Sequence, residues 1–179
     1  MRGWSRWIGK FLGGDPLPFF ELRPHRLSID LWTTFKAPFD ESHARLAVFT
    51  NLTHLDLADG YCSWKHVEGI QYLPRLTHFA ADGDSLTLDL DSIIQGAITH
   101  CERLAIIVLY EIPLNKHEDS GGKVAFERPL RRTIKSIGDP RIVCVERAYL
   151  KEWFVDVQGG RSMWTVAEEI VERRRTSGM

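Results

Sequence analysis

The fold class that the sequence predicts is α/β, with parallel strands and helices stacked in a solenoid. The first observation is a repeat, because the segment Leu52–Leu57 returns as Leu76–Ala81 and its pattern returns once more from Leu104. The second is that helical spacing of apolar residues separates these copies. Strand and helix units with a period of roughly 20 to 29 residues, as here, are typical of leucine-rich repeats. We therefore expect a ribonuclease-inhibitor-like solenoid, with strands on the concave side and helices on the convex side.

Three copies share the pattern apolar-x-x-Leu-x-x-apolar-x-apolar, beginning at Phe49, Leu73 and Cys101. A weaker strand precedes them at 27–31, where we align Ile29 with Leu55. A single unit cannot bury its own apolar face, so at least about three must stack.

The last strand is irregular. The segment Ile142–Val145 follows Leu104 only after a longer interval than those between the regular copies. Asn115–Lys123 is polar and contains two glycines, which favours a loop at 115–123. Residues 20–150 thus predict four to five irregular repeats.

Four helices are expected between the strands, each with a recognisable start or stop residue. Their boundaries are Asp40 or Ser42 to Phe49, Ser63 to the residue before Pro74, Asp91 to Cys101, and Pro129 to Gly138. A short extra strand at 86–90 either stands alone or leads into the third of these helices.

Capping segments are expected at the two ends, 1–19 and 151–179. Residues 1–12 form an apolar helical stripe with basic residues around it, followed by Gly13. This pattern favours a capping helix over a solenoid remnant or a membrane-surface anchor. Ser162 should begin the last helix, whose Arg173–Arg175 end suits the negative pole of a helix dipole better than a nuclear-localisation or phosphate-binding role.

Composition narrows the classes of function. The chain has 179 residues, 23 Lys+Arg against 24 Asp+Glu, a net charge of -1 and three cysteines. Near-neutral charge argues against a dedicated nucleic-acid binder. The three cysteines lie far apart, so no disulfide framework or cysteine zinc site is indicated. No apolar run is long enough for a membrane span. We expect a cytoplasmic protein, with the nucleus as the alternative.

The order and spacing of several motifs resemble uncharacterised fungal F-box-like proteins with leucine-rich repeats. The motifs are Phe49-x-x-Leu52-Thr53-His54-Leu55, Leu73-Pro74-Arg75-Leu76-Thr77-His78, Cys101-x-x-Leu104, Asp139-Pro140-Arg141, Trp153, Gly159-Gly160, Trp164 and Arg173–Arg175. The resemblance spans about 20–175. It implies a ligand-binding repeat region related to ubiquitin-ligase adaptors. The segment 1–20 contains nothing that resembles an F-box, so recruitment of a ligase scaffold does not carry over to this chain.

Strand alternation predicts which side chains form the concave row. With Ile29, Leu55, Phe79 and Ile107 buried, the expected protein-binding residues are Ser28, Asp30, His54, Asp56, His78, Ile106 and Val108. His54 and His78 fall on adjacent strands, which offers an alternative metal-binding or hydrolytic site with Asp56 or Asp30. Two histidines and one carboxylate lack the closed ligand set of a typical metal site, so we expect no metal and no cofactor.

Other motifs add no chemistry. His100-Cys101 suggests a nucleophile, but Cys101 holds a repeat core position and should be buried and inert. His117-Glu118-Asp119 lacks the second histidine of a zinc-protease helix. Asn51-Leu52-Thr53 matches an N-glycosylation sequence, but Leu52 is an expected core residue, so we interpret the match as a chance occurrence.

The sequence therefore predicts a monomeric, non-catalytic module that binds a protein of unknown identity. The metal or hydrolytic reading and a degenerate repeat fragment stay open as alternatives.

Overall fold

A computed structural model describes residues 21–58, 63–83, 89–111, 134–146 and 161–177. The chain divides into two compact units. The first contains 1–81 and 85–105, and the second contains 82–84 and 106–179. Predictions for the helix at 1–12, positions 86–88 of the extra strand at 86–90, the loop at 115–123, the motif His117–Asp119 and the helix start at Pro129 lie outside the described residues.

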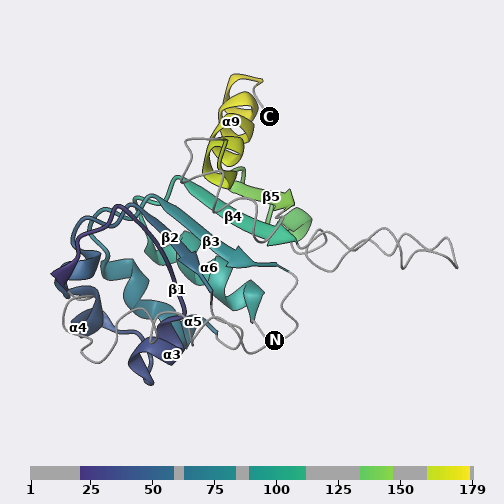
Figure 1. The fold of residues 1–179 in the computed structure, drawn as a ribbon. Helices are drawn as coiled ribbons and strands as arrows, with labels where there is room; N and C mark the ends of the chain where they lie inside the picture. Colours follow the sequence, from purple (N-terminus) through teal and green to yellow (C-terminus); the bar gives the residue numbers. More distant parts are fainter. Residues whose placement is uncertain (1–20, 59–62, 84–88, 112–133, 147–160, 178–179) are drawn as a thin grey trace, which may run out of the picture. The chain divides into compact units, whose positions relative to one another are not determined.

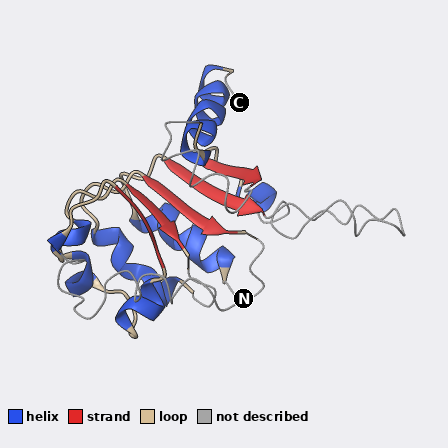
Figure 2. Cartoon of the chain, viewed as in Figure 1, coloured by secondary structure: helices blue, strands red, loops and turns tan. Residues whose placement is uncertain are grey.

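The first unit alternates strands with short helices (Figures 1 and 2). Its elements are β1 (Arg26–Ile29), α3 (Leu31–Phe35), α4 (Glu41–Ala44), the 3-10 helix η1 (Ala47–Phe49), β2 (His54–Leu57), α5 (Trp64–Val67), the 3-10 helix η2 (Glu68–Tyr72), β3 (His78–Asp82, ending in the second unit) and α6 (Leu90–His100). Figure 2 shows the helices of this unit gathered on one side of its strands.

The second unit contains β4 (Ile106–Glu111), β5 (Ile142–Glu146) and α9 (Met163–Thr176). The five strands belong to one sheet in chain order, β1-β2-β3-β4-β5, and the fold is α/β as predicted. β1–β2, β2–β3 and β4–β5 pair in parallel. None of the described helices is both long and apolar enough to cross a membrane.

The positions that recur in the sequence repeat are buried. In each of the three copies the central leucine and the strand residue three positions later are at most 3% exposed: Leu52, Leu76, Leu104, Leu55, Phe79 and Ile107. The Cα register pairs Leu55 with Phe79, as the sequence repeat predicts. Apolar burial at the same place in every copy is what drives such units to stack.

The register of β1 differs from the alignment made on sequence. Leu27 lies opposite Leu55, and Ile29 lies opposite Leu57. The expected pairing of Ile29 with Leu55 is therefore wrong. A slip by two positions leaves every side chain on the same face of the strand, so alternation alone cannot detect it.

The position of the last strand also differs from the one that the sequence interval suggests. Ile142 lies opposite Ile107 in the β4–β5 ladder, and not at the position equivalent to Leu104. Residues 134–137 are helical, and Gly138 follows them with φ 66° while its N–H donates to the carbonyl of Ile134 at 3.0 Å. Gly138 thus ends this helix, as predicted.

Helix starts follow the capping residues that the sequence offers. The side chain of Asp40 accepts hydrogen bonds from the backbone of Ser42 and His43, and Ser63 and Ser162 cap α5 and α9. The helix expected from Asp91 begins earlier, because Asp89 is its cap. A carboxylate at this position satisfies N–H groups that have no partner inside the helix.

Two glycines permit close packing between elements of the first unit. A Cβ on Gly69 would lie 2.5 Å from the carbonyl oxygen of Asp40, and a Cβ on Gly96 would lie 2.0 Å from the indole ring of Trp64. Trp64 also stacks on His100, one turn after Gly96, with ring centroids 5.6 Å apart. Gly96 therefore makes room for the indole on the surface of α6.

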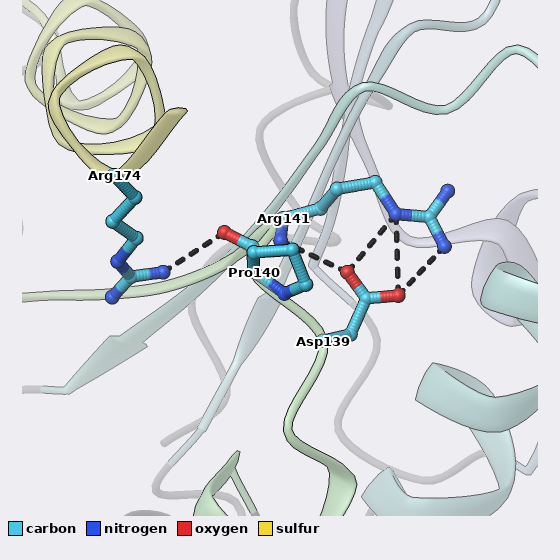
Figure 3. A network of polar contacts seen from close by, with 4 residues as sticks. All are labelled: Asp139, Pro140, Arg141 and Arg174. Carbon is cyan, nitrogen blue, oxygen red and sulfur yellow. Dashed lines mark hydrogen bonds and ion pairs between the residues drawn. The ribbon is translucent and has the colours of Figure 1, made fainter. Parts of the chain in front are cut away.

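The C-terminal helix α9 packs against β4 and β5, which goes beyond the terminal cap expected for 151–179. Its arginine run is tied to the same unit. Figure 3 shows Arg174 reaching Pro140, beside the ion pair of Asp139 with Arg141. The guanidinium of Arg174 donates to the carbonyl oxygens of Pro140, at 2.9 Å, and Ile142, at 2.7 Å. Arg174 thus joins the last turn of α9 to the start of β5.

Candidate functional site

The repeated Thr-His dipeptide builds the same hydrogen-bond arrangement on two neighbouring strands. The backbone N–H groups of Thr53 and His54 both donate to the carbonyl of His25, at 2.9 and 3.0 Å. Those of Thr77 and His78 donate to the carbonyl of Thr53, both at 3.0 Å. One carbonyl thus receives two donors at the start of each strand, which sets the register of the next strand.

The threonine hydroxyls join this arrangement to the imidazoles. The hydroxyl of Thr53 donates to the carbonyl of His25 at 2.9 Å, and that of Thr77 donates to the carbonyl of Thr53 at 3.2 Å. Each hydroxyl oxygen also lies 2.8 Å from Nδ1 of the histidine that follows it. A hydroxyl has a single proton, and here the carbonyl takes it, so Nδ1 must be the donor in the second contact. We infer that Nδ1 of both His54 and His78 carries a proton.

The two rings lie face to face. The centroids of His54 and His78 are 4.0 Å apart and the planes are 10° from parallel. A ligand nitrogen of each ring lies within 4.8 Å of one on the other. Burial, then the neighbouring His78, Arg26 and His25, lowers the pKa of His54 from 6.5 to about 3. His54 is therefore neutral at physiological pH, and desolvation is the main reason.

Asp56 was predicted to be exposed beside the two histidines, but the structure buries it. Its side chain is 5% exposed, and Oδ2 accepts a hydrogen bond from the hydroxyl of Ser28 at 2.9 Å. Ser28 lies opposite Asp56 in the β1–β2 ladder. The carboxylate thus serves as a buried link between two strands, which suits a structural role.

The expected concave row is correct in part. Ser28 is exposed, and His54 and His78 are half-buried. Asp56, Ile106 and Val108 are buried instead of exposed, with relative exposures of 5%, 5% and 0%. Along β4 every residue from Ile106 to Tyr110 is at most 5% exposed, so both faces of that strand are covered, and α9 packs against it. The sequence repeat alone does not predict that this helix covers β4.

Asp30 also differs from its expected place. It lies just beyond β1 and caps α3, where its carboxylate accepts from the backbone N–H and the hydroxyl of Thr33 at 2.6 and 2.7 Å. The residue that shares a row with His54 and His78 is Arg26, which lies opposite His54. We call Arg26, Ser28, His54 and His78 the histidine face.

Cys101 matches its prediction as a core residue. It is 5% exposed, and burial raises the pKa of its thiol to about 11. The thiolate, which is the nucleophilic form, is therefore scarce at neutral pH. Cys101 also borders a surface cavity of about 280 Å³ beside Tyr72 and Arg103.

Sequence reasoning missed the two threonines. Their signal was present, because Leu-Thr-His is identical in the copies at 52 and 76, whereas the strand residues that follow, Leu55–Leu57 and Phe79–Ala81, differ at every position. Identity beyond the apolar positions indicates a side-chain interaction that the repeat needs.

Comparisons with known proteins returned no match to a family, to a curated protein or to a solved structure.

Proposed function

We propose that the chain is a leucine-rich-repeat module that binds a protein ligand on the histidine face. The observation that carries this proposal is the in-register pairing of two copies of one motif, His54 with His78 and Leu55 with Phe79. Repeat units that stack this way use the strand face opposite the buried leucines for recognition. We infer a non-catalytic module of the cytoplasm, with the nucleus as the alternative.

The chemistry of the histidine face favours a polar ligand. Nδ1 of each histidine contacts its threonine and Nε2 of each ring is buried, so the two imidazoles offer a ligand mainly their ring surface. Arg26 is exposed at one side of the row and adds a positive charge. A ligand that carries a carboxylate would complement this charge.

The test is proximity labelling of partners in the native cell, comparing the unaltered chain with Arg26→Glu/His78→Ala. The double variant should lose the enriched partners while the thermal melt shows that it still folds. Lys65→Glu is the matched control, because Lys65 is exposed on α5 and outside the histidine face. Asp56 is unsuitable as a probe, since replacing a buried, hydrogen-bonded carboxylate would unfold the strand pair. Unchanged partners in the double variant would refute the proposal.

The resemblance to F-box-like repeat proteins suggests a narrower role as a substrate-recognition part related to ubiquitin-ligase adaptors. The same labelling experiment tests it. Scaffold subunits of a ubiquitin ligase among the enriched partners would favour this role, and their absence would restrict the chain to repeat-mediated binding.

A second candidate is metal binding by His54 and His78. It is favoured by the two ligand nitrogens within 4.8 Å and by the neutral state of His54 at physiological pH. Asp30 and Asp56 are engaged with Thr33 and Ser28, which weakens the version with an aspartate ligand and also the hydrolytic version. Parallel rings hold their lone pairs side by side, so a shared ion would require the rings to rotate.

Calorimetric titration with Zn²⁺ tests the metal candidate. Stoichiometric binding that His78→Ala abolishes and His100→Ala retains would support it. Absence of heat beyond dilution would remove it.

A further inference from the structure

The end of α9 presents two hydroxyl side chains, Thr176 and Ser177, after three arginines. Ser177 follows Arg173, Arg174, Arg175 and Thr176, and it is exposed. It is the C-cap of α9, and its N–H donates to the carbonyl of Arg173 at 3.0 Å. The binding function proposed above makes no use of this segment.

The two neighbouring hydroxyls are not equivalent. The hydroxyl oxygen of Thr176 lies 3.2 Å from the carbonyl oxygen of Glu172 and 3.0 Å from that of Arg173, so its one proton is shared between them or given to either, which holds it against the helix. Ser177 lies just beyond the last helical position, where helix ends fray readily. Ser177 is therefore the better acceptor of a transferred group.

We propose that Ser177 is a phosphorylation site for a protein kinase that selects arginines on the N-terminal side of its acceptor. Guanidinium groups pair with carboxylates through two parallel hydrogen bonds, and kinases discriminate substrates through such charge patterns. Arg175 is well placed for this recognition, because its side chain is 61% exposed and lies 3.8 Å from its carboxylate neighbour Glu172.

The reaction needs ATP as the phosphoryl donor. The hydroxyl oxygen of Ser177 attacks the γ-phosphorus of ATP, an O–P bond forms, and the bond between the β- and γ-phosphates breaks to release ADP. The hydroxyl proton passes to the catalytic carboxylate of the kinase. The product carries close to two negative charges at pH 7.

The phosphate would act on the contact between α9 and β5. Arg174 precedes Ser177 by three positions, a spacing that puts two side chains on the same side of a helix. Arg174 now donates to the carbonyls of Pro140 and Ile142 (Figure 3). An arginine–phosphate pair is stronger than an arginine–carbonyl hydrogen bond. Phosphorylation of Ser177 therefore draws Arg174 away from β5 and loosens the last turn of α9.

The first experiment incubates the full chain with an arginine-directed serine/threonine kinase and radiolabelled ATP, then maps the label by mass spectrometry. The label should appear on Ser177, vanish in Ser177→Ala and persist in Thr176→Val. Arg175→Ala should lower kcat/KM roughly tenfold or more, whereas Arg161→Ala, which removes an exposed arginine of the same unit, should leave it unchanged. No incorporation, or label that persists in Ser177→Ala, overturns the site.

The second experiment compares thermal melts before and after complete phosphorylation. The modified chain should melt a few degrees lower, and Arg174→Ala should already melt lower without modification. Phosphorylation driven to completion in Arg174→Ala should then add no further decrease. An unchanged or higher melting temperature in the phosphorylated chain, or an equal decrease in the variant, overturns the link to Arg174.

Discussion

Gly96 shows how a single residue decides the packing of a helix. Its missing side chain leaves room for the indole of Trp64, and a Cβ there would lie 2.0 Å from that ring. Gly96→Ala should gain up to about 1 kcal/mol of helix propensity but cost about 1–3 kcal/mol by overpacking. We expect net destabilisation in urea unfolding. Gln95→Ala, an exposed neighbour on α6, should not destabilise the chain, and an equally stable Gly96→Ala would contradict the packing.

The state of His54 makes stability depend on pH. Its pKa is lowered to about 3 in the folded chain from a reference of 6.5, so the unfolded chain binds the proton more readily between these values. The contribution of neutral His54 to the free energy of unfolding is therefore fully present above about pH 6.5, and it is lost as the pH drops towards 3.

The measurement is the free energy of unfolding at a series of pH values. His54→Asn should reduce the slope below pH 6.5, and His100→Asn, at an exposed position, should leave it as it is. An unaltered slope in His54→Asn would mean that His54 is not held neutral by burial.

Residues of the repeat core were predictable because apolar burial recurs at fixed positions, as at Leu52 and Leu76. Thr53 and Thr77 were not predicted, since their role depends on a carbonyl that belongs to the preceding strand. Asp56 was misplaced for a related reason. Alternation identifies the face of a side chain but not what covers that face.

Elements were predicted best where a local residue determines their ends. Asp40, Ser63 and Ser162 cap the helices that the sequence assigns to them. The predicted start of α6 was late because Asp89 and Asp91 are both suitable caps, and local chemistry does not choose between them. Strand register was less predictable, because it depends on the partner strand.

A substitution of Gly138 tests whether its left-handed backbone conformation ends the helix at 134–137. It has φ 66°, and a Cβ there would meet nothing within 4 Å, so any cost of substitution comes from the backbone alone. Gly138→Ala should destabilise the chain by about 1 kcal/mol, and Gly138→Asn by less, because asparagine tolerates the left-handed region better. Chemical denaturation measures the difference. Equal stability of all three chains would show that this backbone conformation is not retained.

At the scale of the whole molecule, strands that are far apart in the sequence pair side by side in chain order. Leu27 of β1 lies opposite Leu55 of β2, which lies opposite Phe79 of β3, so the first of these two intervals is the longer one. Variable intervals are tolerated because the additional residues fall between strands, where added length costs little loop entropy. The α/β class with parallel strands was therefore predictable from the repeat, while the covering of β4 was not.

The proposed binding surface depends on the pairing of His54 with His78. The most direct test is NMR of the imidazole groups in the full chain labelled with ¹⁵N. We expect a proton on Nδ1 of both rings and a ring-to-ring nuclear Overhauser effect, since the centroids are 4.0 Å apart. Nδ1 without a proton in both histidines, together with no Overhauser effect between the rings, would contradict the hydrogen-bond arrangement and the surface built on it.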